Sequence, residues 1–209
     1  MKREEKNAQS RQRILEGALR EFAAKGYEAA SLNTICAQND ISKGIIYHYF
    51  KDKDELYLLC VDQCFSALAG YMREAVAGLS GTVEDHLRGY FDARLRFFAE
   101  HPLFLGIFAN AALNPPAHLA EKIARQRDVF DALNISVLTG LLDSQRLRPG
   151  ITVAAVVEDF RMYMDFFNTR FRAALQEKRS PEQVLREHEE RCHRQLDVLL
   201  HGVLDNSHE

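Results

Sequence analysis

The chain has 209 residues, of which 46% are hydrophobic, and its 27 basic and 30 acidic side chains give a formal net charge of −3. This composition is ordinary for a globular protein of one or two domains, and the charge excludes a protein coated in basic surface. No apolar run approaches the roughly 18 residues that span a bilayer, and the first residues lack a signal core. We therefore expect a cytoplasmic protein with no membrane segment.

The two ends of the chain differ slightly in charge. Up to Leu56 there are ten Lys or Arg against nine Asp or Glu, whereas the remainder has seventeen against twenty-one. The sign favours nucleic-acid binding by the N-terminal part, but the difference is small and supports that function only together with a motif.

The first predicted helix begins at Ser10 and ends at Gly26. Apolar residues recur at helical spacing from Ile14 to Ala23, and Tyr27 is placed to fold back onto the last turn after a glycine C-cap. Residues 1–9 are polar and mixed in charge, which is typical of a frayed terminus. An arm that touches DNA is the alternative.

Two short helices are predicted next, at 31–38 and 42–50. Ser31 and Ser42 are their expected N-caps, and only Asn39, Asp40 and Ile41 separate them. The pattern is helix, tight turn, helix. In the DNA-binding version of this motif, the second helix enters the major groove.

The second short helix has two unlike faces. Ile46, Tyr49 and Phe50 point one way and are expected to be buried. The opposite face carries the residues Lys43, Gly44, Ile45, Tyr47 and His48. One cation, a position without a side chain, an apolar group, a phenol and an imidazole together suit a polyanion with readable edges.

A long helix is predicted from Asp52 to about Gly78, with Asp52 as N-cap and Glu55 completing a capping box. Lys53 lies in its first turn, where a cation opposes the helix dipole. An anion held at the helix start would explain this lysine.

The segment from about Arg11 to Tyr57 resembles the N-terminal domain of the TetR family of transcriptional repressors. The matching residues are Ile14, Ala18, Phe22, Gly26, Tyr27, Ser31, Ile35, Ile41, Ser42, Lys43, Gly44, Ile46, Tyr47, His48, Tyr49, Phe50, Lys53 and Leu56. The resemblance implies an all-α homodimer that binds a near-palindromic double-stranded operator and releases it when a small molecule occupies the C-terminal part.

The candidate DNA-binding residues are Ser31, Asn33, Thr34, Ser42, Lys43, Gly44, Ile45, Tyr47, His48 and Lys53. Lys53 and the Tyr47 hydroxyl resemble the family's phosphate-binding positions, which place the protein without reading sequence. Lys43 is expected to reach guanine acceptors and Ile45 a thymine methyl. His48 packing on Tyr47 is the alternative for that residue.

We expect a three-helix DNA-binding domain at 1–51 and a six-helix ligand-binding and dimerisation domain at 52–209. The later predicted helices begin after Thr82, near Leu103, near Ala117, near Val153 and after Ser180, and Pro102, Pro115, Pro116 and Pro149 lie between them.

Aromatic residues of the second domain are either core or pocket lining. The candidates for ligand binding are Phe91, Arg94, Phe98, Phe104, Phe108, Phe130, Tyr163 and Phe167. His118 is a further possible polar fixture of a pocket. Pockets are lined by the residue types that also fill cores, so the sequence does not separate the two.

The last two helices carry apolar stripes longer than one small body needs to bury, which indicates an interface between two copies. The candidate interface residues are Phe160, Phe171, Leu185, Cys192, Leu196, Leu199 and Val203.

The four cysteines, Cys36, Cys60, Cys64 and Cys192, lie within helical patterns and are interpreted as apolar core side chains, so we expect no metal and no cofactor. Motifs for nucleotide phosphates, zinc proteases or serine hydrolases are absent. A ligand-responsive repressor that is not an enzyme is the predicted function. The alternative is a small-molecule-binding protein or enzyme that retains an unused helix-turn-helix.

Overall fold

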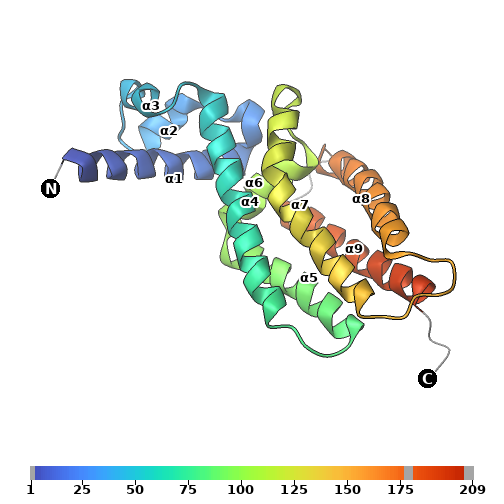
Figure 1. The fold of residues 1–209 in the computed structure, drawn as a ribbon. Helices are drawn as coiled ribbons and strands as arrows, with labels where there is room; N and C mark the ends of the chain where they lie inside the picture. The colour runs from blue at the N-terminus through green and yellow to red at the C-terminus, as the bar shows by residue number, and fades with distance from the viewer. Residues whose placement is uncertain (1–2, 177–180, 205–209) are drawn as a thin grey trace. The chain divides into compact units, whose positions relative to one another are not determined.

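A computed structural model describes residues 3–176 and 181–204, and these residues are helical apart from short turns. The predicted all-α fold is confirmed. The helices (Figure 1) are α1 (Arg3–Ala29), α2 (Leu32–Gln38), α3 (Lys43–Tyr49), α4 (Lys53–Ala77), α5 (Val83–Glu100), α6 (Pro102–Phe108), the π-helical η1 (Ala109–Leu113), the 3₁₀ turn η2 (Ala117–Leu119), α7 (Ala120–Asp143), α8 (Val153–Gln176) and α9 (Pro181–Val203). None of the helices in 3–176 and 181–204 combines the length and the hydropathy that a bilayer span requires.

The chain packs as two compact units. Unit 1 comprises Met1–Phe65 and His101–Arg127, and unit 2 comprises Ser66–Glu100 and Asp128–Glu209. Helices α4 and α7 therefore each contribute residues to both units. The functional boundary that we expect at residues 51 and 52 stays a prediction, because packing groups α6, η1 and η2 with the three N-terminal helices.

Helix α1 begins at Arg3, so the expectation of a frayed segment up to residue 9 is wrong for the described residues. The hydroxyl of Tyr49 donates to Asn7 Oδ1 at 3.2 Å, which gives the first turns a tertiary contact. The predicted break at Gly26 is present, with φ of 69°, a conformation that favours glycine.

The core of unit 1 lies where α1 meets α2, α3 and the start of α4. Its buried side chains include Ile14, Leu15, Phe22, Ile35, Ile46, Phe50 and Leu56. Helix α6 covers α1 as well, and at Gly106 a Cβ would lie 2.5 Å from the carbonyl oxygen of Ala23. Glycine is thus required there for the close approach of two helix backbones.

We expect Gly106→Ala to lower the free energy of unfolding by about 1–3 kcal/mol, because the added methyl meets backbone that cannot move aside cheaply. Gly140→Ala on α7 is the control. Its Cβ meets nothing within 4 Å, so alanine should be neutral or stabilise the exposed helix by up to about 1 kcal/mol. Urea denaturation of both variants would contradict this explanation if Gly106→Ala were as stable as the parent protein.

Unit 2 is organised around α5 and α9, which pack side by side, with α8 along α9 (Figure 1). The start of α5 is fixed by Thr82, whose Oγ1 accepts the backbone N–H of Asp85 while Asp85 Oδ2 accepts the N–H of Thr82, both at 3.1 Å. This reciprocal cap confirms the predicted helix start. The corresponding role of Ser180 lies outside the described residues.

The apolar stripes of α8 and α9 are mostly used inside the chain. The interface candidates Leu185, Cys192, Leu196 and Val203 are buried in unit 2, whereas Phe160 and Leu199 are half-buried and the side chain of Phe171 lies outside the described residues. The four buried side chains are thus not available to a second copy, contrary to their selection from the pattern. Among the side chains of these helices that the structure describes, the large apolar ones that are exposed are Met162 (58%), Phe166 (63%) and Val198 (60%).

Candidate DNA-binding face and effector site

Asn39 holds the turn between α2 and α3 in place. Its Nδ2 donates to the carbonyl of Ile35 at 2.7 Å. Arg13 Nη2 donates to the backbone oxygen of Asn39, and Arg20 Nη2 donates to its side-chain oxygen, both at 2.8 Å. Asp40 follows with φ of 51°, a conformation that Asn and Asp tolerate better than most residues. Two arginines of α1 therefore fix the turn that positions α3.

Helix α3 has the two faces predicted from its sequence. Ile46 and Phe50 are buried, while Lys43, Gly44, Ile45, Tyr47 and His48 are exposed. Ile45 is 40% exposed and Tyr47 50% exposed, so both can contact a partner on this face. The ring of His48 contacts Tyr49, with centroids 5.0 Å apart, rather than packing on Tyr47 as the alternative supposed.

The N-termini of α2 and α3 are built differently. Ser31 Oγ accepts the N–H of Asn33 at 3.2 Å, as expected of an N-cap, and the N–H of Ser31 donates to the buried carboxylate of Glu21 at 3.0 Å. Ser42 has the backbone of a cap, but its side chain makes no capping hydrogen bond, contrary to expectation. Its hydroxyl remains exposed at the start of the α3 face.

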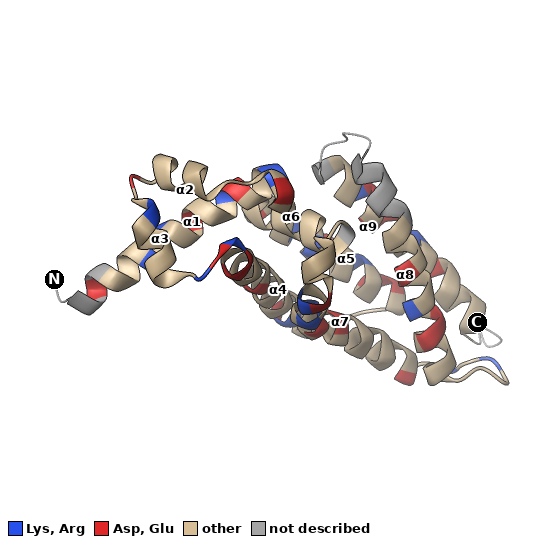
Figure 2. Cartoon of the chain, turned by 90° about the horizontal axis from the view of Figure 1, so that it is seen from above, with Lys and Arg blue, Asp and Glu red and all other residues tan. Residues whose placement is uncertain are grey.

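The start of α4 carries the predicted cap. Asp52 Oδ1 accepts the N–H of Glu55 at 2.9 Å, and Glu55 Oε2 accepts the N–H of Lys51 at 2.6 Å. Lys53 is half-buried, because its Nζ lies 4.4 Å from the centroid of the Tyr27 ring and donates to the carbonyl of Glu28 at 3.4 Å. Figure 2 shows basic and acidic positions next to one another along the ribbon between α3 and α4.

The side chains of Tyr27, Asp54 and His118 form a cluster, and Lys53 lies against the Tyr27 ring of this cluster. The Tyr27 hydroxyl donates to Asp54 Oδ1, and His118 Nε2, from η2, lies 3.4 Å from the same oxygen. The hydrogen bond from Tyr27 lowers the pKa of Asp54, so the carboxylate stays ionised and holds the ring on which Lys53 rests. No sequence signal joins positions 27, 54 and 118, and His118 belongs to this cluster rather than to a pocket.

The candidate effector residues are divided between the units. Phe104 and Phe108 belong to unit 1, where Phe108 packs against Phe65 with centroids 5.8 Å apart. The six in unit 2 are Phe91, Arg94, Phe98, Phe130, Tyr163 and Phe167, and all but the half-buried Tyr163 are buried.

Arg94 is the centre of the unit 2 group. Its guanidinium carbon lies 5.5 Å from the ring centroid of Tyr90, 5.2 Å from that of Phe91 and 5.8 Å from that of Phe130. Its Nε donates to Glu189 Oε2 at 2.5 Å, an interaction that joins α5 to α9. Sequence reasoning selected Arg94 and missed Glu189, because α9 gave no sign that one of its carboxylates turns inward.

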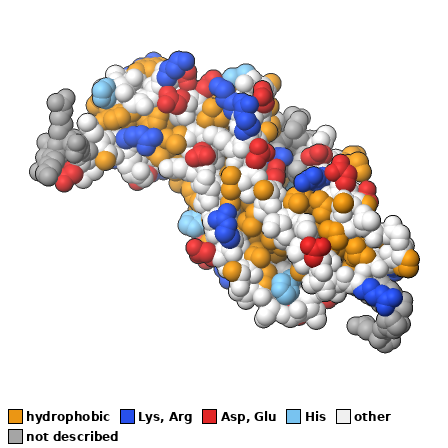
Figure 3. Space-filling view, in the orientation of Figure 1, with side chains coloured by type: hydrophobic (Ala, Val, Ile, Leu, Met, Phe, Trp, Pro, Cys, Tyr) orange, Lys and Arg blue, Asp and Glu red, His pale blue; other side chains and the backbone are white. Residues whose placement is uncertain are grey.

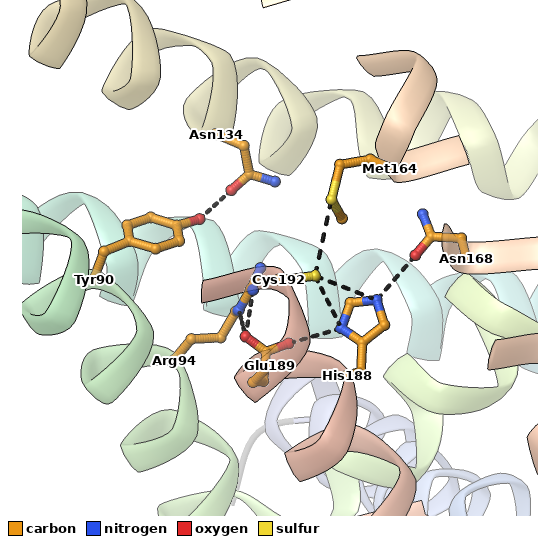
Figure 4. A network of polar contacts seen from close by, with 8 residues as sticks. All are labelled: Tyr90, Arg94, Asn134, Met164, Asn168, His188, Glu189 and Cys192. Atoms are coloured by element: carbon orange, nitrogen blue, oxygen red, sulfur yellow. Dashed lines mark hydrogen bonds and ion pairs between the residues drawn. The ribbon is translucent and has the colours of Figure 1, made fainter. Parts of the chain in front are cut away.

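The ion pair belongs to a larger polar network between α5, α7, α8 and α9 (Figure 4). His188 Nδ1 lies 3.2 Å from Glu189 Oε1, His188 Nε2 lies 3.0 Å from Asn168 Oδ1, and Tyr90 donates to Asn134. Burial alone would raise the pKa of Glu189, but Arg94 and His188 outweigh it and lower that pKa. Glu189 is thus ionised in the interior of unit 2.

Three of the four cysteines, Cys60, Cys64 and Cys192, are buried as expected, whereas Cys36 is only partly buried. Burial raises the pKa values of the thiols of Cys60, Cys64 and Cys192, which disfavours the thiolates that bind metals and attack oxidants. Within 3–176 and 181–204, no group of three or more His, Cys, Asp or Glu side chains is arranged to hold a metal ion.

Residues 14–60 match the family model described as bacterial regulatory proteins, tetR family. The chain belongs to the TetR family. The match contains the α2–α3 turn, the exposed α3 face and the start of α4 with Lys53. It extends three residues beyond Tyr57, the end of the resemblance recognised from the sequence.

Curated relatives match the same end of this TetR-family chain. The transcriptional repressor AcnR of Corynebacterium efficiens is 37% identical over 83 residues, which is 39% of the chain. The matched region spans 44% of the length of AcnR, so the similarity concerns less than half of that protein.

Solved structures extend the similarity of fold to the whole TetR-family chain. A regulator from Mesorhizobium loti has a TM-score of 0.64 at 18% identity and covers 98% of this chain and 100% of its own. FadR of Bacillus subtilis, solved with stearoyl-CoA, has a TM-score of 0.61 at 18% identity, covering 86% of this chain and 95% of its own. At these identities the comparison shows the fold.

An open groove of about 450 Å³ lies in unit 1 of the TetR-family chain, between the start of α4 and the first turns of α7. Four carboxylates line it, from Asp52, Asp54, Glu55 and Asp62, together with Lys51, Lys122, Arg11 and apolar residues of α4. None of the effector candidates lines this groove, and its acidic character makes it unsuited to DNA.

Proposed function

We propose that this chain is a transcriptional repressor that binds a near-palindromic operator as a homodimer and releases it when a small molecule occupies unit 2. The observation that carries the proposal is the exposed face of α3, presented by a turn that two arginines of α1 fix. The similarity of this segment to AcnR, which is named a transcriptional repressor, supports it.

The proposed contacts divide into two kinds. Lys43 and Ile45 on α3, with Asn33 and Thr34 on α2, face base edges, and Gly44 lets the backbone come close. Ser31, Ser42, Tyr47, His48 and Lys53 face the sugar-phosphate backbone on either side. The contact with the Tyr27 ring already restricts the Lys53 side chain in the free protein. The side chain therefore loses less conformational entropy when it binds a phosphate.

We expect Lys53→Ala to weaken binding to operator and to random DNA alike, and to lower the slope of log K against log salt by about one unit, because one phosphate contact is lost. Lys43→Ala should instead reduce the preference for operator over random DNA, by about 1–3 kcal/mol if its contact is bidentate to guanine. Fluorescence anisotropy at several salt concentrations measures both quantities.

Lys122→Ala is the matched control, because this exposed lysine borders the acidic groove of unit 1 rather than the α3 face. It should change neither the salt slope nor the preference. If Lys53→Ala and Lys43→Ala lost equal affinity on both kinds of DNA, the division of contacts would be wrong. If the parent protein bound its own upstream DNA no better than random DNA, the repressor proposal itself would fail, and a binding protein or enzyme with an unused helix-turn-helix would replace it.

The dimer is proposed to form through the exposed apolar side chains of α8 and α9, namely Met162, Phe166 and Val198. Figure 3 shows hydrophobic side chains among charged ones over α7 and α8 on the face seen there. Two recognition helices held about 34–36 Å apart would contact successive major grooves, which gives the operator its near-palindromic form.

Release is proposed to act through α4, which runs without a break from Lys53 in unit 1 to Ala77 in unit 2. An effector that favours a different spacing of the two α3 helices by about 1.4 kcal/mol weakens operator binding about tenfold. FadR, which has a similar fold, was solved in complex with stearoyl-CoA, and this supports a small-molecule effector for this chain. Linkage then requires operator DNA to weaken effector binding by the same factor.

A further inference from the structure

Three side chains with acidic or basic groups are buried in unit 2 among the described residues. Arg94, His188 and Glu189 are exposed by 5%, 4% and 1% respectively. Two basic groups therefore face one carboxylate in the interior (Figure 4). Arg94 directs both its Nε and its Nη2 at the single oxygen Glu189 Oε2, while the other oxygen faces His188. Glu189 thus bridges two bases and does not form the two parallel bonds that a guanidinium can make with a carboxylate.

His188 lies between two oxygens. Its Nδ1 faces Glu189 Oε1 and its Nε2 faces Asn168 Oδ1, while Cys192 Sγ at 3.7 Å and the ring of Phe167 occupy its other sides. An imidazolium donates to both oxygens, whereas a neutral ring donates to one. Each oxygen of the Glu189 carboxylate thus has its own basic partner, so His188 would still contact Glu189 if Arg94 turned to another anion. A buried charge without any partner would be costly.

An additional anion would offer Arg94 a second partner. It would pair with Arg94 through both guanidinium edges, and Glu189 would remain paired with His188. The rings of Tyr90, Phe91 and Phe130 around Arg94 provide apolar surface for whatever carries that anion. Charge and surroundings thus both specify an amphipathic monoanion.

We infer that Arg94 and His188 recognise the anionic group of the effector, and that the effector is a carboxylate on an apolar body which takes over Arg94 from Glu189. The inference rests on the proposed function in one respect, which is that the bound molecule is the effector. The pairing itself concerns unit 2 alone.

Calorimetric titration of the full chain with decanoate and with decan-1-ol tests the inference, because the two probes differ mainly in the carboxylate. Decanoate should bind at least about tenfold more tightly, a difference of about 1.4 kcal/mol. Arg94→Met should remove the difference between the probes, and His188→Gln should reduce it. Glu189→Gln should tighten decanoate by about tenfold or more, since the competing carboxylate is gone, and a gain in affinity does not arise from damage to the fold.

Matched controls lie on the same helices. Arg88→Met on α5 and Glu190→Gln on α9 alter exposed side chains and should leave both affinities unchanged. Equal binding of the two probes to the parent protein, or a Glu189→Gln variant that binds decanoate no more tightly, would overturn the inference. Operator binding of the protein without probe is measured separately, so failure of the effector inference and failure of the repressor proposal are distinguishable.

Discussion

Glu189→Ala is expected to lower the free energy of unfolding by about 3–5 kcal/mol, because it leaves the Arg94 guanidinium charged and buried without its carboxylate. The pair is fully enclosed, with both side chains at most 6% exposed, so solvent screens it little. Urea denaturation followed by circular dichroism measures the loss. The lowered pKa of Glu189 also sets a direction with pH: its stabilising effect is present above the unfolded carboxyl pKa and is lost as pH falls through the folded value.

Two comparisons show whether this loss comes from the stranded charge. The double variant Arg94→Met with Glu189→Met should recover most of it, because replacing both partners by apolar side chains removes the desolvation cost as well. Glu187→Ala breaks an exposed pair with Arg191 on the same helix and should cost about 1 kcal/mol or less. If the double variant were less stable than Glu189→Ala, the ion pair would be a net stabiliser, and a stranded charge would not explain the loss.

Phe166→Glu is expected to separate the proposed dimer and to lower operator affinity by at least about a hundredfold, because the α2–α3 helices of each chain would then bind their half-site alone. Phe166 is 63% exposed in the single chain, so the substitution costs the monomer little. Sedimentation at micromolar concentration measures the association, and anisotropy measures the affinity.

Val129→Glu on α7 is the control for that variant, because it places the same charge at another exposed apolar position, 52% exposed. It should remain dimeric and bind operator normally. A Phe166→Glu protein that stays dimeric would place the interface elsewhere. Dimer loss in both variants would show that neither position is specific.

Local patterns were sufficient for most of the fold. Helical periodicity, the breaks at Gly26 and Pro102, and the cap formed by Thr82 and Asp85 are encoded by residues within a few positions of one another. The start of α1 was not predictable, because residues 3–9 have no apolar stripe and the contact that supports them comes from Tyr49, far along the chain.

The candidate sites were predictable where one helix face carries the chemistry, as on α3. Candidate sites that are formed by segments far apart in the sequence could not be predicted. Tyr27, Asp54 and His118 come from three elements, and Arg94 and Glu189 are separated by 95 positions. The apolar pattern of α9 likewise did not show which of its side chains pack into the chain's own core. Leu196 is buried there, whereas the apolar Val198 is exposed.

Unit 1 is built from two segments that are separate in the sequence. This restricts which chimeras between this regulator and its relatives can fold. A chimera joined at residue 51 would set a foreign α1 against the native α6, where Gly106 leaves no room for a different backbone path at Ala23. The foreign residue at position 27 would also have to pack against the native Asp54 and His118, which contact Tyr27 in this chain. Exchange of operator specificity between relatives should therefore succeed when residues 101–127 are exchanged together with residues 1–65, although a stretch that belongs to the other unit separates the two in sequence.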